Sequence, residues 1–214
     1  MRYIDLETWP RREHFRLYQH LDQPHFNMCA NVDLTAFYAA TRARGIGFMT
    51  GVLYVIARAA NDIPAFRYRM RGDDVIEHET VHPSTTVLSD EGLFGFCSLD
   101  YLADLRSFAA AAGQSMERAK RQPTLQDGLN RDDILFTTSI PWVSFTSFAH
   151  PTHLSPVDCI PRMAWGKRFA DGERIMMPLS VQGHHALMDG YHMGQYYERA
   201  QVYFSEPGLL FATE

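Results

Sequence analysis

A β-hairpin that runs directly into a helix near the C-terminus is the feature that most constrains the fold. Segments 162–169 and 173–182 are strand-like, and Ala170-Asp171-Gly172 between them predicts a hairpin turn. The second strand leads through Gln182-to-Gly190 into a helix over residues 191–204. This order breaks the regular strand–helix alternation of a doubly wound fold, so the pattern favours an α+β sandwich of sheet and helices.

The rest of the chain mixes helices and strands without a regular order. Helices are predicted over residues 11–21, 34–44, 48–61 and 102–121, and strands over residues 26–33, 67–70, 75–78, 85–88, 93–99, 134–138 and 143–148. Neither a low-complexity linker nor an internal repeat divides the 214 residues. We therefore expect residues 1–214 to form a single domain.

Charge and cysteine content argue against several classes of protein. Acidic and basic residues are interspersed at a net charge of -5, and the lack of a Lys/Arg-rich run argues against a nucleic-acid partner. The three cysteines form no CxxC pair, which argues against a disulfide framework and suits a reducing compartment. The most apolar stretch, residues 51–60, includes Arg58 and is too short to span a bilayer. We expect a cytoplasmic protein with no membrane partner.

The clearest functional signal is the segment Gln182-Gly183-His184-His185-Ala186-Leu187-Met188-Asp189-Gly190. A strand-to-helix turn can hold the His185 imidazole rigidly and leave one nitrogen open. With a pKa of roughly 6.5, such a ring can take a proton from a hydroxyl near neutral pH. Asp189 could accept a hydrogen bond or pair with a cation to fix the turn. An isolated pair of histidines is more often a plain structural feature, but the full HHxxxDG pattern is much more specific.

This pattern resembles the active-site motif of a superfamily of CoA-dependent and carrier-dependent acyltransferases. Two further segments, residues 9–15 (WPRREHF) and 141–148 (PWVSFTSF), are similar to segments of the chloramphenicol acetyltransferases. Residues 178–182 also lead into the histidines as they do in that family. The resemblance runs in register from Trp9 to about Phe204. Peptide-synthetase condensation domains are much longer and lipoyl acyltransferases carry a carrier domain, so the chloramphenicol acetyltransferases fit best.

The resemblance implies a mixed β-sheet flanked by helices in a two-layer sandwich. It also implies that acetyl-CoA is the co-substrate and that no metal takes part. The second histidine of the pair, His185, would take the proton of a chloramphenicol hydroxyl. The oxygen would then attack the thioester directly, without an acyl-enzyme. The family is homotrimeric with active sites at subunit interfaces, so we expect a homotrimer.

Other site residues follow from the same resemblance. Thr138 stands where the family has a serine that donates a hydrogen bond to the oxyanion, and Ser139 is the alternative donor. Asp189 would pair with Arg11 to hold the turn of the base. Ala164 occupies a position where many members have a threonine that helps to hold a water molecule.

Substrate-contacting residues are also expected by position. An acceptor pocket should be apolar with few polar groups, and its candidate residues are Leu17, Tyr18, Phe96, Phe136 and Phe148. Each of these is also a plausible plain core residue. Trp142 and Lys167 are expected near CoA, although Lys167 is equally plausible as a solvated charge at a strand end.

Three alternatives remain open. The first keeps the chemistry but changes the acceptor to another small alcohol, because Thr138, Ala164 and the loop of residues 22–26 depart from the family pattern. The second is a metal-binding protein that uses the histidines and aspartate of residues 184–192, although their spacing does not match a usual zincin. The third is a catalytically inactive binding protein of the same fold, which the intact histidine, aspartate and arginine argue against.

Overall fold

The computed structural model describes residues 1–153 and 158–211. Its elements follow the chain in this order: β1 (Arg2–Tyr3), α1 (Arg12–Tyr18), β2 (His25–Asp33), α2 (Thr35–Ala43), α3 (Phe48–Asn61), α4 (Pro64–Arg67), β3 (Tyr68–Arg71), β4 (Asp74–Glu77), β5 (His82–Leu88), β6 (Phe94–Ser98), α5 (Leu105–Arg121), β7 (Ile134–Ile140), β8 (Arg162–Gly166), β9 (Phe169–Asp171), β10 (Arg174–His184), α6 (Gly190–Ser205) and the 3-10 helix η1 (Pro207–Leu210).

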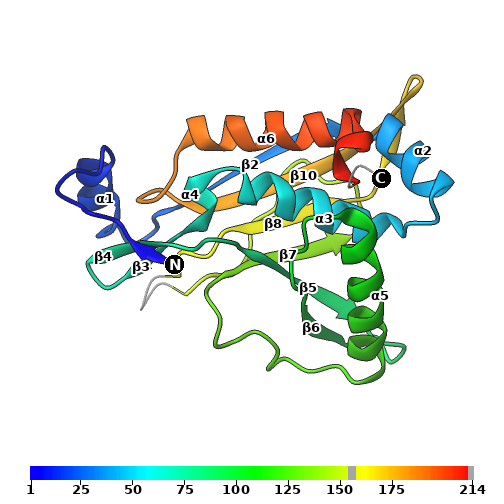
Figure 1. Ribbon diagram of the computed structural model, residues 1–214, viewed down its shortest axis with the longest axis horizontal. Coiled ribbons are helices and arrows are strands. Elements are labelled where there is room, and N and C mark those ends of the chain that lie inside the picture. Colours follow the sequence, from blue (N-terminus) through cyan, green and yellow to red (C-terminus); the bar gives the residue numbers. More distant parts are fainter. Residues whose placement is uncertain (154–157, 212–214) are drawn as a thin grey trace.

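A seven-stranded mixed sheet forms the centre of the fold (Figure 1). Its strand order is β2-β10-β8-β7-β5-β6, and β9 pairs with β10 beside this path. Strand β7 runs parallel to both β5 and β8, whereas the remaining pairs are antiparallel. A separate three-stranded sheet has the order β1-β4-β3. The predicted α+β class with a mixed sheet is confirmed.

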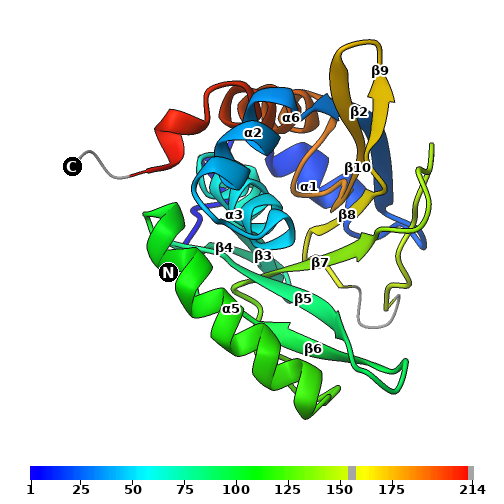
Figure 2. The ribbon, with the colours of Figure 1, turned by 90° about the vertical axis from the view of Figure 1, so that its right-hand side faces the viewer.

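Helices α2, α3, α5 and α6 cover one face of the large sheet (Figure 2). On this face, alternate residues of the central strands pack into the main core, among them Met163 and Trp165 of β8 and Leu179 of β10. Helix α3 is buried on nearly all sides. At its start, a Cβ on Gly51 would come within 2.8 Å of the Phe37 ring, so glycine permits the close approach of α2.

The opposite face of the sheet carries mostly small and polar side chains. Strand register places Phe96 beside five of them in what we call the cross-strand row: Phe96, Thr86, Thr138, Ala164, Ser180 and Cys29, one from each strand of the path. Figure 2 shows the helices of the described residues on the other side of the large sheet.

The predicted strand over residues 143–148 is wrong. After β7 the chain turns at Pro141 and continues without regular structure, because proline has no N–H for a strand ladder. The segment's backbone groups bind to β10 side chains instead. Ser180 Oγ donates to the Phe148 carbonyl at 3.1 Å, and the His150 N–H donates to Gln182 Oε1 at 3.0 Å.

Most other predicted elements are confirmed to within a few residues. The predicted hairpin turn holds Gly172 at φ 61°, a left-handed conformation that favours glycine. Helix α1 is shorter than predicted and ends at Tyr18. Among the described residues, every helix is too short or too polar to traverse a lipid bilayer.

A wholly buried arginine connects the two sheets. Arg69 of β3 is 0% exposed. Its guanidinium donates to the main-chain carbonyls of Phe66 and Tyr68 at 3.0 and 2.6 Å, and to those of Asp132 and Ile134 at 2.6 and 2.7 Å. These bonds satisfy the buried charge without a carboxylate at hydrogen-bond distance, and they fix the small sheet against the start of β7.

Candidate active site

His185 lies in the turn that joins β10 to α6. The main-chain N–H of His185 donates to the Pro24 carbonyl at 2.8 Å. The main-chain N–H groups of Leu187 and Met188 both donate to the His184 carbonyl. Gly183 leaves the space that this reversal needs, because a Cβ there would lie 2.2 Å from Met188 Sδ. The turn is therefore fixed by main-chain bonds and close packing.

Two aromatic rings hold the His185 imidazole. The Tyr18 ring stacks on it with a centroid distance of 3.9 Å and an interplanar angle of 2°, and the Phe26 ring lies 4.7 Å away. His185 Nδ1 is buried and has no hydrogen-bond partner among the described residues. Nε2 does not share this state of being both buried and unpartnered. The contacts fix the plane of the ring and leave Nε2 as the nitrogen that can meet a substrate.

Asp189 caps helix α6 and pairs with Arg11. Its carboxylate accepts from the Tyr191 N–H at 3.0 Å and from His192 Nδ1 at 2.8 Å, and it forms an ion pair with the Arg11 guanidinium. Burial would raise the pKa of Asp189, but the Arg11 and His192 hydrogen bonds outweigh it and hold this pKa well below its ordinary value. The carboxylate is therefore ionised, and its described partners support the turn rather than contacting the imidazole of His185.

Arg11 reaches the turn because a second small core places α1 beside it. Phe15 of α1 packs with Val75 of β4 and with Ala186 and Leu187 of the turn. From this position Arg11 Nη2 also donates to the His185 carbonyl at 3.4 Å. Figure 1 shows α1 at the end of the molecule where β10 turns into α6.

His192 is a site residue that sequence reasoning did not assign to this network. It sits at the third position of α6, where a capping box has its second polar side chain, and here Nδ1 donates to Asp189 Oδ1 at 2.8 Å. An aspartate three residues before a polar side chain at a helix start was the available signal. A capping box usually has Ser or Thr at the N-cap and Glu or Gln three residues later. Asp189 and His192 do not match this pattern, so the sequence did not indicate them as a pair.

Thr138 lies far from the imidazole within one chain. Ala164 pairs with Thr138 on one side and Ser180 on the other, and His184 stands four residues beyond Ser180 along β10. At about 3.3 Å per residue and about 4.8 Å per strand, Thr138 and His184 are about 16 Å apart. A single subunit therefore cannot bring Thr138 and His185 to the same carbonyl group.

Thr138 points to the face without helices, where its Oγ1 lies 2.9 Å from Thr86 Oγ1. Strand alternation turns Ser139, the alternative donor, to the helix-covered face beside Trp165. Of these two hydroxyls, only that of Thr138 belongs to the cross-strand row.

The residues expected in the acceptor pocket are divided between the two regions. Tyr18 is in contact with His185, and Phe96 and Phe136 share the face of Thr138. Phe136 lies under the Arg162 guanidinium at 5.0 Å. Phe148 packs 4.8 Å from the His150 ring. Leu17 is 62% exposed in the single chain and contributes nothing to the contacts around the imidazole.

The two residues expected near CoA come from adjacent segments. The Lys167 N–H donates to the carbonyl of Val143, the neighbour of Trp142, at 2.9 Å. Lys167 is exposed and Trp142 is 67% exposed. An indole and an ammonium group are thus available at the same edge of the molecule.

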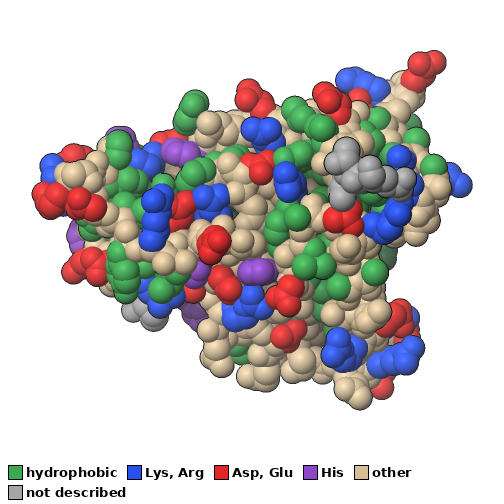
Figure 3. All heavy atoms as spheres, in the orientation of Figure 1, with side chains coloured by type: hydrophobic (Ala, Val, Ile, Leu, Met, Phe, Trp, Pro, Cys, Tyr) green, Lys and Arg blue, Asp and Glu red, His purple; other side chains and the backbone are tan. Residues whose placement is uncertain are grey.

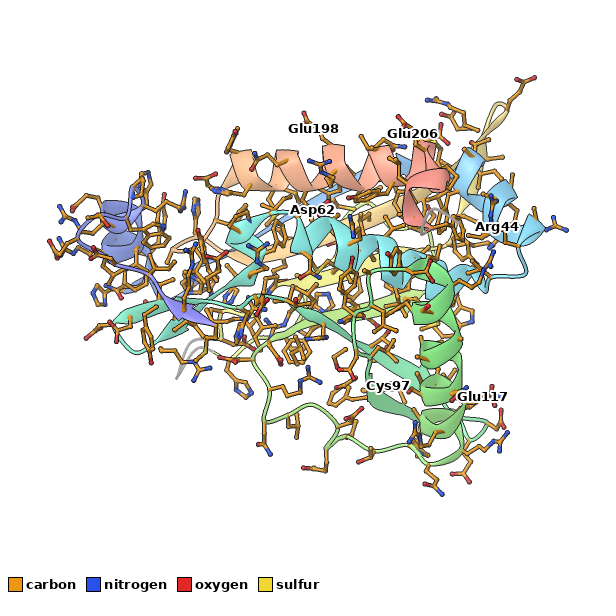
Figure 4. The ribbon with its side chains drawn as sticks, viewed as in Figure 1. Arg44, Asp62, Cys97, Glu117, Glu198 and Glu206 are labelled. Carbon is orange, nitrogen blue, oxygen red and sulfur yellow. The ribbon has the colours of Figure 1, made fainter. Side chains whose placement is uncertain are left out.

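Two surface hollows formed by the described residues lie away from this site. One of about 530 Å³ lies between β6, α5 and residues 122–127 and is lined in part by Phe96 and Cys97; Figure 4 labels Cys97 on β6, beside α5. Another of about 500 Å³ lies between β2 and α6. Neither reaches His185. Acidic and basic side chains alternate over the face seen in Figure 3, and residues 1–153 and 158–211 contain no cluster of His, Cys, Asp and Glu suited to a metal ion.

His184, the first histidine of the pair, is buried rather than available to substrate. It is 0% exposed, and Nδ1 accepts from the Ala186 N–H at 3.2 Å. Burial, together with the nearby His25 ring, lowers the pKa of His184 to about 4. His184 is therefore neutral near neutral pH.

We expect protonation of His184 to reduce stability in acid. Below pH 6.5 the unfolded chain binds a proton at this residue that the folded protein accepts only near pH 4, so the free energy of unfolding falls as pH decreases between these values. The full loss from one such group is about 3 kcal/mol. Urea unfolding of His184→Asn should show a slope against pH that is lower by about 1.4 kcal/mol per pH unit in this window. An unchanged slope would contradict the burial of a neutral ring.

Comparisons with known proteins point to one family. The family model described as chloramphenicol acetyltransferase matches residues 1–201. A chloramphenicol acetyltransferase from Klebsiella is 29% identical over 95% of this chain and 93% of its own length. Chloramphenicol acetyltransferase 2 from Escherichia coli is 32% identical over 93% of this chain and 94% of its own.

Solved structures show the same fold. A chloramphenicol acetyltransferase structure superposes with a TM-score of 0.89 at 24% identity, covering 95% of this chain and 99% of the other. The dihydrolipoamide acetyltransferase of Azotobacter vinelandii gives a TM-score of 0.68 at 20% identity, covering 92% of this chain and 89% of the other.

Proposed function

Because the chain belongs to the chloramphenicol acetyltransferase family, we propose that it is an O-acetyltransferase that transfers the acetyl group of acetyl-CoA to a hydroxyl of chloramphenicol. The observation that carries this proposal is the imidazole of His185, which contacts the Tyr18 and Phe26 rings. Its Nδ1 is buried, and its Nε2 is available to a substrate. The relatives named chloramphenicol acetyltransferase supply the acceptor. All 214 residues would act as one acyltransferase domain in the cytoplasm, where acetyl-CoA is available.

The proposed reaction has two steps without an acyl-enzyme. His185 Nε2 takes the proton of the acceptor hydroxyl while the hydroxyl oxygen attacks the thioester carbonyl. A C–O bond forms, and the carbonyl oxygen becomes an oxyanion. The intermediate then collapses, the C–S bond breaks, and the imidazolium returns its proton to the departing thiolate. The products are the acetyl ester and free CoA. Thr138 donates a hydrogen bond to the oxyanion.

We further propose that each active site forms between two subunits of a homotrimer. The separation of about 16 Å between Thr138 and the histidine pair within one chain supports this arrangement. A neighbouring subunit can present its own Thr138, from the face of the sheet without helices, to His185. The same contact would cover Phe96 and Phe136, which are the aromatic residues that we assign to the acceptor pocket along with Leu17, Tyr18 and Phe148.

At the other end of the proposed site, Trp142 and Lys167 would bind CoA. The exposed indole can stack on the adenine, and the ammonium group can pair with a phosphate. The hydrogen bond between the backbones of residues 143 and 167 supports a shared role, because it keeps the two segments together.

A second candidate keeps the chemistry and changes the acceptor to another small alcohol. The cross-strand row favours it, since Ala164 stands directly between Thr138 and Ser180 and leaves an apolar gap among hydroxyls. A metal-binding role receives no comparable support, because Asp189 is engaged by Arg11 and His192 while His184 is buried.

Mass spectrometry of chloramphenicol after incubation with the protein and acetyl-CoA tests the proposal. We expect the mass of the drug to increase by one acetyl group, with thiol release at the same rate. Thiol release above background with a panel of other alcohols, but none with chloramphenicol, would favour the second candidate. No release with any alcohol would contradict both.

A further inference from the structure

Thr138 does not stand alone on its face of the sheet. Thr86, from the adjacent parallel strand β5, is its neighbour in register, and the two Oγ1 atoms lie 2.9 Å apart. Both residues are half-buried. At this distance the two hydroxyls share a hydrogen bond of normal length.

The number of hydroxyl protons in this pair decides whether it can donate a hydrogen bond to a substrate. Two hydroxyls carry two protons, and the bond between them uses one. Neither hydroxyl makes another hydrogen bond with a described residue. Whichever hydroxyl accepts the shared bond therefore keeps its own O–H free for a further acceptor.

We propose that Thr86 is a positioning residue that donates to Thr138 and thereby directs the Thr138 O–H toward the oxyanion; this role rests on the proposed function. A threonine has a stiff χ1, so a fixed partner at Oγ1 selects one rotamer. A hydroxyl that accepts a hydrogen bond also becomes a stronger donor. In this way Thr86 allows Thr138 to do what a serine does elsewhere in the family.

The direction of the bond follows from the charge that develops. An oxyanion attracts a hydroxyl proton strongly because charge-assisted hydrogen bonds are about twice as strong as neutral ones. When Thr138 donates to the oxyanion, the bond between the threonines can persist only if Thr86 is the donor. The second hydroxyl thus supports the transition state without contacting the substrate.

Kinetics of Thr86→Val and Thr86→Ser test this role. Valine keeps the shape of threonine but cannot donate, so kcat should fall by about tenfold while both KM values stay within about twofold. Serine keeps the hydroxyl and should retain kcat within about threefold of the wild type. Thr86→Ala serves as the second variant if the valine protein does not fold.

The neighbouring hydroxyl provides a matched control. Thr85 lies on the same strand but faces the helices, and its buried Oγ1 has no hydrogen-bond partner among the described residues. Thr85→Val removes a hydroxyl of the same kind without touching the pair. We expect this variant to keep the kcat of the wild type.

A double-mutant cycle separates positioning from direct contact. In a Thr138→Val background, Thr86→Val should change kcat by less than about twofold, because Thr86 has no donor left to orient. Additive effects, or a raised KM for the acceptor with unchanged kcat, would overturn the role. An active wild type that Thr86→Val leaves unaffected would overturn this inference alone. A wild type inactive toward every alcohol tested would overturn the proposed function together with it.

Discussion

Replacing His185 with alanine should reduce kcat at least a hundredfold, because general-base assistance by a positioned side chain is worth about 10²- to 10⁴-fold. The Tyr18 and Phe26 rings would then face an empty space, and neither ring supplies an imidazole nitrogen in its place. His185→Gln should lose as much activity, since an amide keeps a similar size but cannot take the proton. Steady-state thiol release with acetyl-CoA and chloramphenicol measures the effect.

Two controls separate chemistry from folding in this experiment. The melting temperature and the oligomeric state should stay unchanged, because the turn is held by main-chain bonds and by Asp189 rather than by the imidazole. Free imidazole should partly restore turnover of the alanine variant by entering the space beside Tyr18. Turnover above one-hundredth of the wild-type rate would count against His185 as the base.

Mixing two inactive variants should restore activity if each site is shared between subunits. His185→Ala removes the base, and Thr138→Val removes the oxyanion donor at a cost of about 10²- to 10³-fold. In a trimer refolded from equal amounts of both, a site is intact when one subunit supplies His185 and its neighbour supplies Thr138. Random assembly gives this combination at about one quarter of the sites.

We therefore expect activity of up to about one quarter of the wild type after mixed refolding. Each variant refolded alone provides the control, as does mixing the folded trimers without denaturant. A mixed sample no more active than the two separate ones would show that both residues act within one chain. That result would be incompatible with the strand register that separates them.

Local patterns in the sequence were sufficient to predict most of the secondary structure. The α3 range of residues 48–61 was predicted without error because a continuous apolar run is bounded by Gly47 and Pro64. The β9–β10 turn was recognised because glycine is needed at residue 172. Residues 143–148 misled the prediction, since the segment has no strand partner and Val143 is 54% exposed, while the Phe148 carbonyl accepts from the Ser180 side chain.

Within the candidate site, the HHxxxDG motif indicated His185 and Asp189, the family resemblance of residues 9–15 indicated Arg11, and the structure brings these residues together. The sequence could not indicate the Tyr18 stack or the Thr86–Thr138 pair in the same way. The stack depends on how α1 packs against the turn after β10, and the threonine pair depends on the register of β5 and β7, neither of which a local pattern encodes. The buried state of His184 also depends on tertiary packing around β10.

The guanidinium of Arg69 has a consequence for how this protein can change over generations. Its four described hydrogen bonds all end on main-chain oxygens, and every amino acid supplies such an oxygen. Positions 66, 68, 132 and 134 can therefore drift in side-chain identity without losing a bond. Position 69 has no such freedom, because lysine offers a single nitrogen in place of a planar fork. We expect the hydrogen bonds of Arg69 to persist through changes at these four positions, whereas burial separately constrains the side chains of Phe66 and Ile134.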